Sequence, residues 1–325
     1  MKLDTVIDYL LDRVTDPVPR YILFKEILPH PESSDQCKDM YDNIMSSKWY
    51  LQLKSEQWPD GTWGRFHTQD TKSVRKQKFV TTEAALRRMR ELSLDSNDPM
   101  AAACLHRMEE YLKGSDLWPD RIEKHYGFVI ALNTIVAANL SLFDPDNPLI
   151  QHKRKVCAEN ITKAFQNGVF IEDIWEAENH RCNEILLRAY MVHPVWLLQN
   201  NPYLSEDIQR KYLGYLWTRK EGIYYISGSA PAAMAPIGSR RFYEWLANLE
   251  AISGFSLFPE FMREGAAEQL LDDAYRLMNH EVALAPSHPI YGHYSESWRN
   301  NTARNYDMLL RILRVLIRCN ETVNI

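Results

Sequence analysis

The sequence predicts an all-α protein in which about six helical hairpins form an α/α toroid. Apolar residues recur at helical spacing along almost the whole chain, and the alternation typical of β-strands is nearly absent. Helices with one polar face alternate with helices that carry apolar residues on most sides. A helix that is apolar all round must be buried all round, so this alternation indicates an outer layer of helices covering an inner one.

The expected helices pair in chain order, each outer helix followed by an inner one. Four of them begin after a capping residue, at Asp98-Pro99, Asn147-Pro148, Ser205 and Asn301. The six pairs are 4–14 with 19–28, 36–53 with 81–92, 99–112 with 126–142, 149–165 with 180–192, 206–217 with 241–252, and 266–279 with 302–317.

Length and composition fit one globular domain over residues 1–325. Hydrophobic residues make up 45% of the chain and charged residues 25%, which is typical of a folded protein. The formal net charge is -5, and the basic residues form no stripe that could follow the phosphates of a nucleic acid. We therefore expect no nucleic-acid partner.

The cysteines and the apolar segments predict a cytoplasmic protein with no membrane span. The chain begins without the apolar stretch of a signal peptide, and its longest apolar run, residues 127–143, is interrupted by polar side chains. The five cysteines are scattered and form no Cys-x-x-Cys pair, as expected of free thiols in a reducing compartment: Cys37, Cys104, Cys157, Cys182 and Cys319.

A short motif, Trp-Pro-Asp-Gly-Thr-Trp-Gly at residues 58–64, precedes the expected inner helix at 81–92. A weaker copy stands at residues 117–120. Pro-Asp-Gly is turn chemistry, since proline fixes φ, aspartate bonds the following backbone and glycine takes a positive φ. The two tryptophans are of a size to wedge between neighbouring helices.

This motif, with Thr-Thr-Glu-Ala-Ala-Leu at residues 81–86, resembles the repeat of the squalene cyclase and protein prenyltransferase superfamily. The resemblance covers about residues 54–92. It implies an α/α toroid in which the repeat ties outer helices to inner ones, so that Trp58, Asp60 and Trp63 would be structural residues.

The reactive motifs of that superfamily are missing. Asp144-Pro145-Asp146-Asn147 lacks the last aspartate of Asp-x-Asp-Asp, and Asp272-Asp273 lacks the third aspartate of a diphosphate-ionising motif. Asp35-Gln36-Cys37 has the letters of a zinc pattern but lies at the wrong end of the chain. No metal site is predicted, and the sequence leaves the cofactor undetermined.

The residues expected to face the cavity of the toroid are polar. His180 and Glu184 stand four apart, so that on one helix the carboxylate could orient the imidazole as a general base. Glu83 is the third candidate catalytic residue. Candidate substrate-binding residues are Tyr126, Arg181, Asn183, Arg241, Glu244, Arg304 and Asp307. The alternative is that these charges pair with one another and only satisfy a polar interior.

Three functions remain open at this point, including whether the chain is an enzyme. The first is an enzyme that binds a small anionic or prenyl substrate in the cavity. The second is a toroid that binds a ligand or a protein without catalysis. The third is a glycan-directed hydrolase or lyase, suggested by the histidines and tyrosines of residues 288–299.

Overall fold

The computed structural model describes residues 2–28, 35–69, 72, 74, 76–114, 123, 126–285 and 290–320. Within these ranges the protein is all-α, as predicted, with no strand and one isolated bridge between Met191 and Tyr224. Its helices are α1 (Leu3–Arg13), α2 (Pro17–Ile22), the π-helical turn η1 (Leu23–Ile27), α3 (Asp35–Met45), α4 (Lys48–Glu56), α5 (Thr82–Glu91), α6 (Pro99–Leu112), α7 (Tyr126–Ser141), α8 (Gln151–Ala164), α9 (Glu172–Cys182), α10 (Val192–Leu198), α11 (Glu206–Thr218), α12 (Arg240–Ile252), α13 (Phe258–Met262), α14 (Ala266–Met278) and α15 (Asn301–Asn320).

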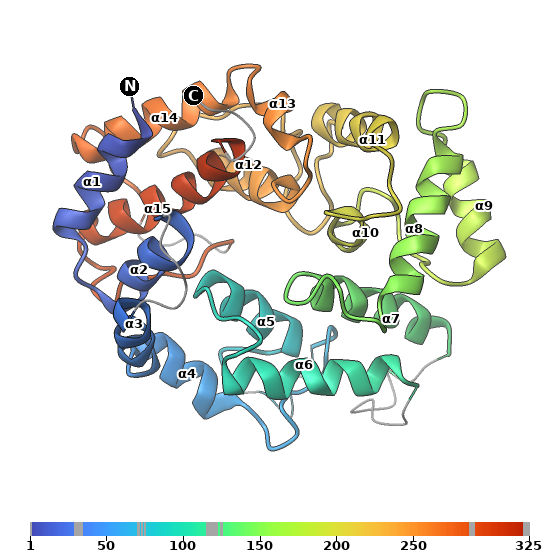
Figure 1. Ribbon diagram of the computed structural model, residues 1–325, viewed down its shortest axis with the longest axis horizontal. Coiled ribbons are helices and arrows are strands. Elements are labelled where there is room, and N and C mark those ends of the chain that lie inside the picture. Colours follow the sequence, from blue (N-terminus) through green and yellow to red (C-terminus); the bar gives the residue numbers. More distant parts are fainter. Residues whose placement is uncertain are drawn as a thin grey trace.

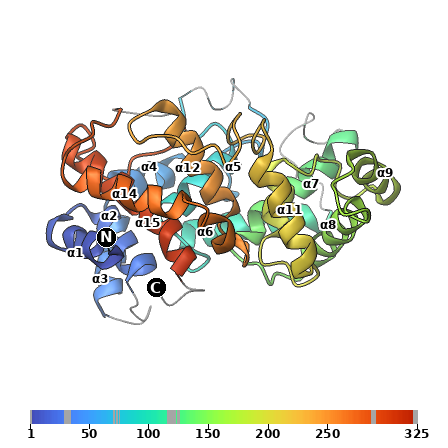
Figure 2. The ribbon, with the colours of Figure 1, turned by 90° about the horizontal axis from the view of Figure 1, so that it is seen from above.

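The helices follow one another around the view of Figure 1 in chain order. Helices α5, α10, α12 and α15 lie towards the middle of that view, whereas α4, α6, α9, α11 and α14 lie towards its rim. The first helix returns to the last ones, because α1 packs against both α14 and α15. Seen from above, α1 to α3 and α14 gather at one end of an elongated molecule and α7 to α9 at the other (Figure 2).

Most of the expected helices are confirmed, but three ranges differ. The range 19–28 is covered by α2 and the π-helical turn η1. The range 36–53 is divided into α3 and α4, because the Ser47 hydroxyl accepts a hydrogen bond from the amide of Tyr50 (3.3 Å) and starts a new helix. The helix expected over 180–192 is wrong. Helix α9 ends at Cys182, and Asn183 takes a left-handed conformation (φ 52°) that stops it before the separate helix α10.

The expected helix caps are confirmed at Asp98 and Ser205. The Asp98 carboxylate accepts two amide hydrogen bonds at 2.9 Å, and the Ser205 hydroxyl accepts one at 3.4 Å. Asn147 bonds the amide of Leu149 in the turn ahead of α8 rather than capping the helix itself. At α15 the side chain that caps is Asn300, one residue before the expected Asn301, and it accepts from the amide of residue 302.

The tryptophan motif joins three helices. The indole of the fully buried Trp63 donates to the carbonyl of Leu53 in α4 (2.9 Å). The backbone amide of Trp63 donates to the hydroxyl of Thr82 in α5 (3.1 Å). Gly61 has φ 86°, and a Cβ there would lie 2.6 Å from the carbonyl oxygen of Ala103 in α6. Each of these contacts serves packing, as expected of the motif. The weaker copy around Trp118 lies outside the described residues.

In the part of the chain that the structure describes, no helix is both long and apolar enough to cross a membrane. The described cysteines Cys104, Cys157, Cys182 and Cys319 carry free thiols. The side chain of Cys37 lies outside the described part.

Candidate functional site

The segment after the tryptophan motif holds His67 against the first turn of α5. The buried carboxylate of Glu123 accepts hydrogen bonds from the amides of Phe66, His67 and Thr68 at 2.9, 2.9 and 3.0 Å. The amide of Glu83 donates to the carbonyl of Phe66 at 3.0 Å. The backbone around His67 is therefore fixed beside Glu83 by charged and neutral hydrogen bonds together.

Glu83 is the centre of a three-residue cluster. One carboxylate oxygen lies 2.6 Å from Nδ1 of His67, and the other lies 2.7 Å from Nε2 of His193, at the start of α10. Asn139 of α7 donates to the same carboxylate at 3.2 Å. The side chains of His67 and Glu83 are about one-fifth exposed, and His193 is buried. One ligand-forming atom from each of His67, Glu83 and His193 lies within 4.8 Å of the other two.

The cluster keeps Glu83 ionised. Burial opposes ionisation, but the hydrogen bonds from His193 and His67 outweigh it and hold the pKa of Glu83 well below its usual value. Burial also works against a charge on His67, yet the hydrogen bond to Glu83 raises the pKa of that imidazole. The arrangement favours a carboxylate facing an imidazolium, which is a pair able to hold and release a proton.

Aromatic rings cover the cluster. The ring of Tyr225 lies edge-on to both imidazoles, with centroid distances of 5.9 Å to His67 and 5.8 Å to His193. Trp196 lies 5.5 Å from His193. Tyr225 has φ 75°, a conformation that costs energy in a residue with a side chain and that is concentrated at functional sites.

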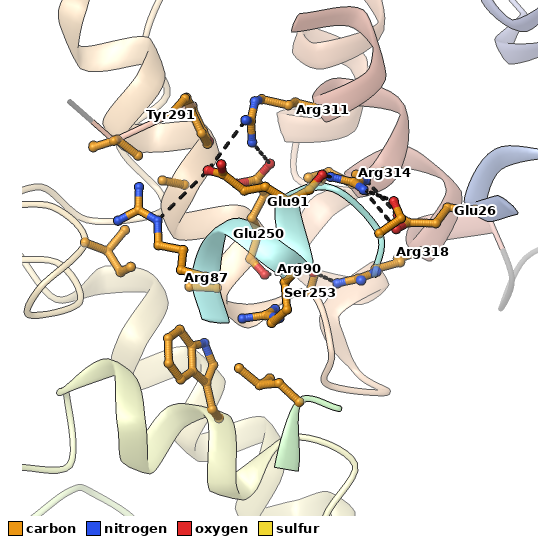
Figure 3. Close-up of a pocket in the computed structure, with 18 of the residues that line it drawn as sticks. Glu26, Arg87, Arg90, Glu91, Glu250, Ser253, Tyr291, Arg311, Arg314 and Arg318 are labelled. Carbon is orange, nitrogen blue, oxygen red and sulfur yellow. Dashed lines mark hydrogen bonds and ion pairs between the residues drawn. The ribbon is translucent and has the colours of Figure 1, made fainter. Parts of the chain in front are cut away.

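A cavity of about 350 Å³ begins at this aromatic cover, because Tyr225 and Trp196 line it as well. Its size suits a small organic ligand. The inner elements α5, α12 and α15 supply most of its charged side chains (Figure 3). Six cationic residues line it against four carboxylates: Lys25, Arg87, Arg90, Arg311, Arg314 and Arg318 against Glu26, Glu91, Asp95 and Glu250.

Several of these cations are held by carboxylates. Arg314 lies 2.7 Å from Glu26, and Arg311 lies 3.6 Å from Glu91 and 3.8 Å from Glu250. The dashed lines of Figure 3 join these pairs. Two further pairs, Lys25 with Asp95 and Arg87 with Glu91, account for two more cations.

Arg90 and Arg318 are different, because neither forms an ion pair with any described carboxylate. The guanidinium of Arg90 lies over the ring of Trp196, 5.5 Å from its centroid, and Arg318 donates to the hydroxyl of Ser253. Burial and the neighbouring charge of Arg318 lower the pKa of Arg90 to about 10, so that Arg90 remains charged at neutral pH. Both also line a second cavity of about 370 Å³, which shares Leu142, Trp196 and Ser253 with the first.

Among the predicted site residues, only Glu83 lies at this site. His180 and Glu184 are not brought together, since α9 ends between them: His180 is exposed in the last turn of the helix, and Glu184 pairs with Lys153 at 2.8 Å. The i,i+4 spacing indicates a shared face only within one continuous helix.

The remaining candidates are dispersed. Arg181 is exposed and pairs with Glu178, Asn183 is the exposed end of α9, and Arg241 is exposed on α12. Glu244 faces Arg240 at 3.7 Å.

The last three candidates lie in or near α7 and α15. Arg304 donates to the carbonyls of Trp298 and Arg299 at 2.9 Å and so holds the loop before α15. Asp307 is buried and accepts from the amides of Tyr294 and Ser295, which gives it a structural role. Tyr126 opens α7, and its side chain lies outside the described residues.

Sequence reasoning missed His67, His193, Arg90 and Arg318. Two signals were present. Glu83, Arg87 and Arg90 are spaced i, i+4, i+7 on one helix, and Arg311, Arg314 and Arg318 are spaced i, i+3, i+7 on another, so each set follows one face. No local signal pairs His67 with His193, which are 126 positions apart in the numbering of the chain.

The His- and Tyr-rich segment serves packing in its described part, residues 290–299. The ring of His293 stacks on Trp298 at 4.4 Å, and Tyr294 is buried. His288 and Pro289 lie outside the described residues. No family model, curated protein or solved structure matches the chain.

Proposed function

We propose that the chain is an α/α toroid of the prenyltransferase and squalene cyclase kind, and an enzyme that takes an organic phosphate or diphosphate with an apolar body into the arginine-lined cavity. The observation that carries the proposal is the pair Arg90 and Arg318, two cations that line both cavities and form no ion pair with a carboxylate in the part of the chain that the structure describes. The Glu83 cluster at the edge of the cavity is its acid–base centre.

The charge of the cavity supports an anionic ligand. Two guanidinium groups that are close enough to repel each other, one of them desolvated, are stabilised by a group of charge near -2 placed between them. A phosphate offers several acceptor oxygens to the planar guanidinium fork, so arginine suits it well.

The rest of the cavity supports an apolar body on that anion. Uncharged side chains form part of the cavity wall, among them Leu142, Phe143, Trp196 and Ile226. A ligand whose phosphate lies at Arg90 and Arg318 would extend its apolar part along this wall towards Tyr225. There the Glu83–His67 pair can give or take a proton.

The binding step is tested by titrating the protein with geranyl diphosphate, inorganic diphosphate and geraniol. Each titration is followed by the heat of binding or by the thermal midpoint of unfolding. We expect geranyl diphosphate to bind most tightly, inorganic diphosphate to bind more weakly, and geraniol, which lacks the anion, to bind weakest. Arg318→Gln and Arg90→Gln should each weaken diphosphate binding by about tenfold or more, because a hydrogen bond to a charged group contributes about 1.5–3 kcal/mol.

The matched control is Arg210→Gln. It removes an exposed arginine of α11 that pairs with Glu260 of α13. This variant should bind diphosphate with the same affinity as the unchanged protein. Equal affinity in the Arg318→Gln and unchanged proteins, or no response to either phosphate compound, would overturn the proposal.

A further inference from the structure

We propose that His67, Glu83 and His193 form a binding site for one divalent transition-metal ion of the zinc type. The inference concerns the same cluster to which the proposed function assigns proton transfer. It does not depend on the arginines, so the loss of anion binding would leave it standing.

The residue types match the ligands of such ions. Two imidazole nitrogens and one carboxylate are a common protein ligand set for zinc, and they leave at least one coordination position open. Three separate segments supply them: the loop after the tryptophan motif, the first turn of α5 and the start of α10. These segments are far apart in the chain, yet they converge under an aromatic cover. A chance contact of two histidines with one exposed carboxylate would not require this convergence.

The geometry is close to that of a coordinated ion. Donor atoms at the usual zinc distance of about 2.0–2.1 Å lie about 3.3 Å apart in a tetrahedral site. Nδ1 of His67 and Nε2 of His193 lie 2.6 and 2.7 Å from different oxygens of Glu83, and one ligand atom of each residue lies within 4.8 Å of the other two. Each nitrogen would move away from its carboxylate oxygen by about 0.6 Å to admit the ion. Small rotations of side chains supply such a movement without a change of backbone.

The surroundings would orient the ligands. Glu123 fixes the backbone of His67 through three amide hydrogen bonds. Asn139 donates to the Glu83 carboxylate and so orients it from outside the cluster. Outer contacts of this kind set the direction of metal ligands and raise metal affinity. An open position facing Tyr225 would let a bound water, or an oxygen of a ligand in the cavity, reach the ion, and a water bound to zinc ionises near neutral pH.

Metal binding is tested on the full chain with no phosphate compound present. The purified protein is treated with a chelator, dialysed and titrated with Zn²⁺ by calorimetry, and a second sample is titrated with Co²⁺ while its visible absorption is recorded. We expect one ion per chain, and a Co²⁺ spectrum of the intensity that four- or five-coordinate nitrogen and oxygen sites give.

Variants locate the ion. His67→Gln, at a partly exposed position, and His193→Gln, at a buried one, should each weaken Zn²⁺ binding by more than about tenfold. Circular dichroism identifies any variant that fails to fold. If His193→Gln does not fold, the Zn²⁺ affinity of His67→Gln, which disturbs the core least, is the deciding measurement. The control is His152→Gln, which removes an exposed histidine near Glu184 and should leave the affinity unchanged.

Two results would overturn the inference. One is an unchanged protein that binds neither Zn²⁺ nor Co²⁺, and the other is a folded His67→Gln protein that binds Zn²⁺ as tightly as the unchanged one. In either case the cluster acts by proton transfer alone, and the diphosphate titration still tests the proposed function.

Discussion

Thr82 joins the tryptophan motif to the helix that carries Glu83, and its hydroxyl can be removed without changing the shape of the side chain. The buried hydroxyl accepts a hydrogen bond from the amide of Trp63 (3.1 Å) and donates one to the carbonyl of Gly64 (3.3 Å). Thr82→Val replaces it by a methyl group of similar size and leaves both backbone groups buried without a partner.

The expected loss follows from these two groups. An unsatisfied buried donor or acceptor costs about 1–3 kcal/mol, so the loss of two partners in Thr82→Val should lower the free energy of unfolding by about 2–6 kcal/mol. The assay is equilibrium unfolding in urea, in which an unchanged slope shows that the loss belongs to the folded state.

Thr82→Ser is the matched control for this substitution. It keeps the hydroxyl and loses one methyl group, which should cost about 1 kcal/mol. A Thr82→Val protein as stable as the Thr82→Ser protein would refute the view that hydrogen bonds at Thr82 hold the motif to α5.

Two further predictions concern stability. Gly61→Ala should lower the thermal midpoint and reduce the free energy of unfolding by about 2 kcal/mol or more. Alanine is strained at φ 86°, and its Cβ would collide with the backbone carbonyl of Ala103. An unchanged midpoint would contradict this prediction. Burial opposes the ionisation of Glu91, but Arg311 and Arg88 overcome it and lower its pKa to about 2. Because this pKa lies below the unfolded value, the stabilisation is present above about pH 4.5 and is lost as the pH falls towards 2. Unfolding at a series of pH values should therefore show on the order of 3 kcal/mol lost over this range, and Glu91→Gln should show a flatter profile; parallel profiles would contradict the assignment.

The helices could be predicted because the pattern that encodes them is local. Apolar spacing and capping residues lie within a few positions of each other, as Asp98 ahead of α6 illustrates. The prediction over 180–192 failed because nothing in the apolar pattern reveals that Asn183 adopts a left-handed conformation. A break of this kind removes the shared face on which the pairing of His180 with Glu184 depended.

The site could be predicted only in part, because its contacts are long-range. Glu83 was predicted as a polar residue facing a cavity, and the structure places it in the cluster. Its partners His67 and His193 lie in a loop and at the start of a short helix, where periodicity carries no information. Arg241 and Arg304 lie near the starts of α12 and α15, yet which way such side chains point depends on packing that spacing does not encode.

We propose above that Arg90 and Arg318 together hold an anion inside the protein, next to the Glu83 cluster. A crystal structure of the protein grown with tungstate, a strongly scattering analogue of phosphate, tests it most directly. We expect an anomalous difference peak between the two guanidinium groups. Tungstate bound only at surface arginines, with none between Arg90 and Arg318, would contradict it.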